Sequence, residues 1–353
     1  MTLKFNQNSA FKNVMFLAAV ILIIAGIMAA KDIVIPIILA LFLSIICSQP
    51  ILFLQKRKFP YSVALLIVLA CLAFTVILLG GIVGNSISNF MVDLPIYEEK
   101  LREIFSIVIA NINKTGTDIT TEQVFKLIDP GQVLSFSALA AGEIGKVLSD
   151  SFLIVLIMIF MLLEVKILIL KTALIEKIFG NSLEYLNKIG KNIRHYLSIK
   201  TYVSIITGLL IWLWLFILGV EYAILWGLIA FLLNYIPNIG SLLAAIPTLL
   251  FSLIQLGFEG MVWVGICYIV INTIMGNIVE PKVMGKGLGL STLVVFLALI
   301  LWGFILGPVG MFLSIPLTIT IKIILEQYEK TRWIAVLLGT EKETKQMLNN
   351  FQN

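Results

Sequence analysis

The most constraining feature of the chain is a pair of charge-free apolar runs that are too long for one membrane helix. Residues 222–258 form a run of 37 and residues 287–321 a run of 35, with no charged side chain in either. About 20 residues suffice for a helix to cross the hydrocarbon core of a bilayer. Two full spans joined by a turn need slightly more residues than either run contains. Each run therefore predicts two half-length helices joined by a break.

The remaining sequence is typical of a multi-pass membrane protein. Hydrophobic residues make up 60% of the chain and charged residues 13%, and the mean hydropathy is +1.05. Such values lie far outside the range of soluble domains. We expect an all-α, polytopic integral membrane protein with about eight hydrophobic elements, two of them inverted broken or re-entrant hairpins. The other apolar runs are 14–30, 33–54, 61–84, 152–163, 201–220 and 260–279.

The charges of the loops predict how the chain is oriented. The basic cluster Lys56–Lys58 and the net positive segment 164–200 are expected on the cytoplasmic side, because Lys and Arg are enriched there. Segment 93–150 carries nine acids and five bases and is expected outside. Both termini are then cytoplasmic, provided that each long run returns to the side from which it starts. The first hairpin would enter from outside and the second from inside.

Two parts of the chain share one pattern, a single span followed by a double-length run. Span 201–220 with run 222–258 matches span 260–279 with run 287–321. The breaks read "IPNIGSLLAAIP" and "GPVGMFLSIP", each with Pro, a nearby Gly and a second Pro. Proline and glycine also produce simple kinks in membrane helices. Two matched breaks instead indicate a transporter, whose substrate site lies at such interruptions.

These features predict five regions of the chain. An N-terminal transmembrane hairpin with a basic loop occupies 1–60. Helices 3 and 4 occupy 61–170 and include an extracytoplasmic helical insertion at 85–150. A cytoplasmic amphipathic segment follows at 171–200, the transport core of two inverted repeats at 201–325, and a cytoplasmic tail at 326–353.

Polar and helix-breaking residues within the apolar core are the candidates for the substrate or ion pathway, because they can replace the hydration of a solute. They are Asn234, Pro237, Asn238, Gly240, Asn272, Asn277, Glu280, Gly307, Pro308 and Gly310.

Glu280 directly precedes Pro281, so a helix is predicted to end there. Its carboxylate could couple protons, or it could form an ordinary ion pair with Lys282 or Lys286. No acid lies well inside a long run, which disfavours a charge-based proton relay and is compatible with a neutral, hydroxyl-rich solute. Backbone carbonyls at the breaks could still bind Na⁺, so H⁺ and Na⁺ both remain possible coupling ions.

Other classes of function have little support in the sequence. No HExxH, GxSxG or Walker motif occurs, and the only histidine, His195, lies in a charged segment. Cys47, Cys71 and Cys267 lie in apolar runs without CxxC spacing, so no catalytic, metal or cofactor-binding residue is predicted. No basic patch suited to nucleic acid is present. A passive channel or an assembly scaffold remains the alternative to a secondary transporter.

The segments "FLLNYIPNIGSLLAAIPTLL" at 231–250 and "NIVEPKVMGKGLGLSTLVVFLALILWGFILGPVGMFLSIPL" at 277–317 resemble the AI-2E family of bacterial membrane permeases. The order of elements agrees along nearly the whole chain. The resemblance implies a multi-pass transporter of the bacterial cell membrane that assembles as a homo-oligomer. The family includes exporters of the quorum-sensing molecule autoinducer-2 and proteins described as Na⁺(Li⁺)/H⁺ antiporters, so the cargo is expected to be a small polar solute or a monovalent cation.

Overall fold

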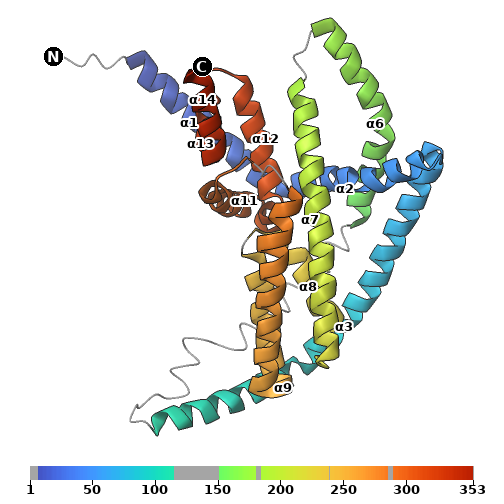
Figure 1. Cartoon of the computed structure of the whole chain (residues 1–353), viewed down its shortest axis with the longest axis vertical. Coiled ribbons are helices and arrows are strands. Elements are labelled where there is room, and N and C mark those ends of the chain that lie inside the picture. The colour runs from blue at the N-terminus through green and yellow to red at the C-terminus, as the bar shows by residue number, and fades with distance from the viewer. Residues whose placement is uncertain (1–6, 115–150, 180–183, 238, 285–288, 353) are drawn as a thin grey trace, which may run out of the picture. The chain divides into compact units, whose positions relative to one another are not determined.

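Within the part of the chain described by the computed structural model, every regular element is a helix (Figure 1). The described residues are 7–114, 151–179, 184–237, 239–284 and 289–352. The all-α prediction is confirmed. The helices are α1 (Gln7–Ala29), α2 (Lys31–Lys56), α3 (Tyr61–Asn113), α6 (Ser151–Phe179), α7 (Glu184–Ile217), α8 (Ala223–Leu233), α9 (Gly240–Asn272), the π-helix η1 (Thr273–Val279), α10 (Glu280–Met284), α11 (Thr292–Phe312), α12 (Ser314–Gln327), α13 (Arg332–Leu338) and α14 (Glu341–Gln352).

Eight helical segments match the expected number of hydrophobic elements. Among the described residues, five segments are long and apolar enough to cross a membrane, and three are shorter apolar helices. This confirms a polytopic membrane protein. The long segments are Lys31–Lys56, Tyr61–Phe90, Lys188–Ile217, Gly240–Met284 and Thr292–Phe312, and the short ones are Ala18–Ala29, Phe152–Val165 and Ala223–Leu233.

The chain divides into two compact units. The first comprises residues 1–45, 153–189 and 290–353, and the second residues 46–152 and 190–289. The first long run and both single spans of the predicted repeats belong to the second unit. The second long run belongs to the first unit, apart from its first residues.

Helix α9 of the second unit is itself a hairpin. Gly257 has φ 74° and ψ −169°, a conformation open essentially to glycine alone. The chain reverses there, so the first arm of α9 (residues 240–256) packs beside its second arm (residues 258–272). The hydroxyls of Thr248 and Tyr268, almost equally far from Gly257 along the chain, hydrogen-bond at 3.0 Å. Run 222–258 thus consists of α8, a break and this first arm, as predicted.

Helix α3 continues well beyond its apolar part and packs against α8 and α9. The hydroxyl of Tyr97 in α3 donates a 2.7 Å hydrogen bond to Glu221, and Tyr222 donates one of 2.7 Å back to Asp93 in α3. Phe90 packs between these tyrosines in an aromatic cluster. These crossed bonds attach the polar end of α3 to the turn between α7 and α8. The rest of the predicted insertion, residues 115–150, lies outside the described part of the chain.

In the first unit, α11 also contains a glycine reversal. Gly307 has φ 66° and ψ −151°, nearly the conformation of Gly257, and α12 then packs back against α11. The long run 287–321 is therefore also built from two helical arms, as predicted.

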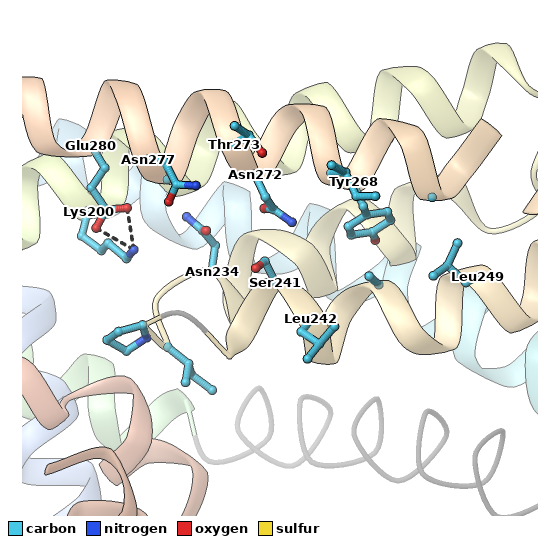
Figure 2. Close-up of a pocket in the computed structure, with 16 residues that line it drawn as sticks. Lys200, Asn234, Ser241, Leu242, Leu249, Tyr268, Asn272, Thr273, Asn277 and Glu280 are labelled. Atoms are coloured by element: carbon cyan, nitrogen blue, oxygen red, sulfur yellow. Dashed lines mark hydrogen bonds and ion pairs between the residues drawn. The ribbon is translucent and has the colours of Figure 1, made fainter. Parts of the chain in front are cut away.

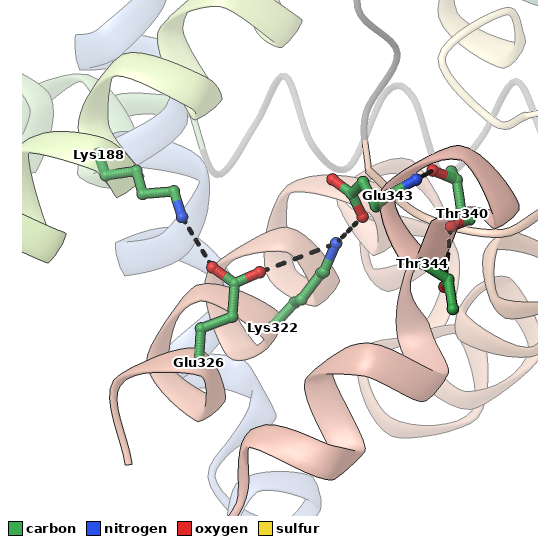
Figure 3. Close-up of polar contacts among 6 residues, drawn as sticks. All are labelled: Lys188, Lys322, Glu326, Thr340, Glu343 and Thr344. Carbon is green, nitrogen blue, oxygen red and sulfur yellow. Dashed lines mark hydrogen bonds and ion pairs between the residues drawn. The ribbon is translucent and has the colours of Figure 1, made fainter. Parts of the chain in front are cut away.

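A network of ion pairs connects charged side chains of α12 with other helices of the first unit (Figure 3). Buried Lys322 lies 2.6 Å from Glu343 of α14 and 3.8 Å from Glu326, which pairs at 2.7 Å with Lys188. These contacts connect α12 with α14 and with the start of α7.

Candidate functional site

A glycine allows the two helices at the break between α8 and α9 to lie close together. A Cβ added at Gly240 would overlap the carbonyl oxygen of Leu233, the last residue of α8. The first turn of α9 therefore lies directly against the end of α8. Only glycine allows this close approach. This geometry explains why the motif "IPNIG" ends in glycine.

Side chains of the break are attached to α7. The Asn234 amide donates a 2.9 Å hydrogen bond to the hydroxyl of Ser204, and the Tyr235 hydroxyl donates one of 2.8 Å to Thr201. Ser204 and Thr201 lie within one turn of α7. A break within an apolar region needs such partners, because unsatisfied polar groups are costly there.

A pocket of about 560 Å³ lies beside this break, within the second unit (Figure 2). Its walls come from α7, the break, both arms of α9, η1 and α10. Five predicted pathway residues line it: Asn234, Pro237, Asn272, Asn277 and Glu280. The folded α9 hairpin brings these positions together although the chain separates them by up to 46 residues (280 − 234). Carboxamides, hydroxyls and one ion pair supply both donors and acceptors to the pocket.

Glu280 pairs with Lys200, a partner that the sequence analysis did not consider. The Lys200 ammonium lies 2.9 Å from each carboxylate oxygen of Glu280, and the side chains are 5% and 17% exposed. Lys282 is exposed, and Lys286 lies outside the described residues. The prediction that Glu280 pairs with Lys282 is therefore wrong, because its carboxylate faces α7 across the pocket.

The predicted helix end at Glu280 is also wrong. The helix continues through Pro281 to Met284, because the preceding residues adopt the wider π-helical register. A proline ring collides with the carbonyl four residues earlier in an α-helix, and a π turn relieves this contact. The Glu280 N–H bonds to the carbonyl of Met275, five residues earlier. In the same register the Gly276 carbonyl would need the N–H that Pro281 lacks.

The other predicted residues are not at this pocket. Gly240 shapes the break without lining the pocket, and Asn238 lies outside the described residues. Gly307, Pro308 and Gly310 belong to the first unit. There a Cβ on Gly310 would overlap the Trp302 carbonyl, just as one on Gly240 would overlap Leu233. At both breaks, a glycine thus packs directly against a backbone carbonyl of the preceding helical segment.

Sequence reasoning missed several lining residues, namely Lys200, Ser241, Tyr268 and Thr273. Lys200 ends a basic segment, so the sequence groups it with the cytoplasmic charges. Its position directly before the apolar run 201–220 was the available signal. Tyr268 contacts Thr248 and the Ala244 carbonyl, so it joins the two arms of α9 while forming part of the wall. His195 is exposed, with Nε2 3.5 Å from the Met284 carbonyl, and does not line the pocket.

Comparisons with known proteins agree with this architecture. Residues 17–330 match the model of the AI-2E family transporters. The AI-2 transport protein TqsA of Escherichia coli is 39% identical over 334 residues, which cover 94% of this chain and 96% of TqsA. Two further relatives carry the name "Putative transport protein". One is from Haemophilus influenzae, 36% identical over 96% of this chain and 99% of its own, and the other is YhhT of Escherichia coli, 34% identical over 92% and 93%.

Proposed function

Because the chain belongs to the AI-2E family of transporters, we propose that it carries a small polar solute such as autoinducer-2 across the membrane by alternating access through the α8–α9 pocket. In this proposal it works as a secondary transporter in the bacterial cell membrane, with both termini in the cytoplasm and several copies assembled together. TqsA is named as an AI-2 transport protein, which supports this choice of solute.

One observation carries the proposal: three asparagines and a partly buried ion pair line one pocket at a broken helix. Asn234, Asn272 and Asn277 come from three different elements, and each offers a donor and an acceptor. The positive charge of Lys200 and the negative charge of Glu280 cancel, so the pair adds no net charge to the pocket. A neutral solute with several hydroxyl groups suits such a lining, since each hydroxyl can both donate and accept.

Antiport of Na⁺ or Li⁺ against H⁺ is the alternative within the same family. An antiporter needs a carboxylate that exchanges one cation for another. The Glu280 carboxylate, the one acid among the lining residues, already holds the Lys200 ammonium on both oxygens. This contact favours solute transport over cation exchange.

Flux into liposomes tests the proposal. Liposomes that contain the purified protein should accumulate labelled autoinducer-2 faster when their interior holds unlabelled autoinducer-2. An alternating-access carrier returns to the outward-facing state faster when it binds solute on the inner side. The same vesicles are tested for Na⁺ and Li⁺ flux with and without a pH gradient. Equal flux without this acceleration, at channel rates, would support the passive-channel alternative and contradict the carrier.

Substitutions then connect the flux with the pocket. Asn234→Ala and Asn277→Ala should each lower autoinducer-2 flux, because each removes a hydrogen-bonding group from the wall. Asn89→Ala is the matched control, since Asn89 is exposed on α3 and does not line the pocket. Wild-type flux in both pocket variants would exclude this pocket as the route.

A further inference from the structure

The Lys200 ammonium occupies a position suited to a bound cation. Its nitrogen lies at the same distance, 2.9 Å, from both oxygens of Glu280. A cation held by a bidentate carboxylate sits in the same symmetric place. The lysine side chain is only 5% exposed, so the ammonium has given up nearly all its water for protein contacts. Such an exchange is stable only with close compensating oxygens.

Further oxygen atoms of the pocket come from η1 and the α8–α9 break. Residue 281 is proline and has no N–H, so the π-helical register offers no donor to the Gly276 carbonyl, and Gly276 is one of the residues that line the pocket. Asn277 follows it on the same wall. Asn234 lies across from them, with one N–H of its amide donating to Ser204 and its carboxamide oxygen available as an acceptor.

The charge of this group of oxygens selects a monovalent cation. Glu280 is its one acid, and the other oxygens belong to neutral amides. Sites for Ca²⁺ combine several carboxylates with six to eight oxygens, which this wall does not provide. Na⁺ instead suits one carboxylate together with backbone carbonyls of an interrupted helix.

We propose that Lys200 is a tethered cation that permanently fills a monovalent-cation site formed around Glu280, so that this chain binds its solute without Na⁺. The ammonium supplies the positive charge that holds α7 against α10. Removing the side chain should expose the carboxylate and its neighbouring oxygens and create a functional Na⁺ site. The consequence for transport rests on the proposed function, whereas the ion binding itself does not.

Thermal unfolding of the purified full-length protein tests the ion binding directly. Wild type should unfold at the same temperature in NaCl and in N-methyl-D-glucamine chloride of equal ionic strength. Lys200→Ala should unfold several degrees lower in the organic salt, and rising NaCl should restore its stability in a saturable way, because a ligand that binds only the folded state stabilises it. Lys282→Ala is the matched control, since Lys282 is exposed on α10, and should behave as wild type.

The double variant Lys200→Ala with Glu280→Gln should show no response to Na⁺, because it lacks the carboxylate. Lys200→Met, which keeps much of the side-chain volume, is the second variant should Lys200→Ala fail to fold. The proposal is overturned if the folded single variants ignore Na⁺, if wild type itself responds to Na⁺, or if neither variant folds in NaCl.

Flux measurements separate this inference from the proposed function. Autoinducer-2 flux by wild type should be equal in the two salts, and flux by Lys200→Ala should require Na⁺. An absence of any autoinducer-2 flux in wild type would contradict the proposed solute, while the unfolding data would still decide whether Lys200 fills a cation site.

Discussion

The hydroxyl of Tyr222 donates a 2.7 Å hydrogen bond to the carboxylate of Asp93, which lies 129 residues earlier in the chain. Burial is the main cause that raises the pKa of Tyr222, and the bond to Asp93 adds to it, so that the pKa reaches about 12. Tyr97, which donates to Glu221, has its pKa raised by the same two causes in the same order. Both phenols therefore stay protonated at pH values where an ordinary tyrosine ionises.

This contact predicts a stability loss at alkaline pH. A group with a raised pKa in the folded state contributes stability that is fully present below its unfolded pKa, about 10 for tyrosine, and is lost as pH rises through its folded pKa. We expect the stability from Tyr222 to fall between pH 10 and about pH 12. The absorbance titration of wild type minus Tyr222→Phe should show a phenol with a midpoint near 12. A midpoint near 10 would mean that Tyr222 is neither buried nor bonded to Asp93.

Glu280→Gln should destabilise the second unit, because it leaves the buried Lys200 ammonium without its counter-charge. We expect a loss of about 3 kcal/mol, at the lower end for broken buried pairs because Glu280 keeps some exposure. Glu343→Gln is the matched comparison at the other buried lysine, Lys322. It should cost only about 1 kcal/mol, because Glu343 is more exposed and Lys322 keeps Glu326. Denaturant unfolding of both variants measures the difference, and equal losses would contradict it.

Gly276→Leu should block transport without unfolding the protein. A Cβ added at Gly276 would meet no atom within 4 Å, and Gly276 lines the pocket, so we expect the leucine side chain to fill part of it. Leucine also favours helix more than glycine does. Autoinducer-2 flux in liposomes should be lost while the unfolding temperature stays the same or rises. Gly26→Leu in α1, also in open space, controls for adding a leucine to a helix and should transport normally.

Gly257→Ala and Gly307→Ala should be destabilising by similar amounts. Both glycines have positive φ with extended ψ, and an added Cβ would contact no neighbouring atom at either. The cost is therefore conformational, about 1–3 kcal/mol each. Gly265→Ala is a suitable control, because its backbone is helical and its Cβ would reach only ordinary contact with Leu249 at 3.4 Å. Thermal unfolding of the three variants should show that Gly257→Ala and Gly307→Ala are both less stable than Gly265→Ala. The prediction is wrong if Gly265→Ala is the least stable of the three.

Local features of the chain determined much of this architecture. The lengths of the apolar runs fixed the number of hydrophobic elements, because a bilayer sets the length of a helix. Pro237 and Gly240 located the first break, and Gly307 and Pro308 the second, because a missing N–H or Cβ acts on the backbone at its own position. Asn234, Asn272 and Asn277 were also identified as polar residues in an apolar region.

Only the tertiary structure decided what these residues face. The partner of Glu280 is Lys200, 80 residues away, and it depends on how α7 packs beside α9 and its extension. Pro281 does not end its helix, because η1 changes the hydrogen-bond register before it. The reversal at Gly257 places both arms of α9 around one pocket. Contacts across such distances depend on helix packing rather than on the residues beside them in the chain.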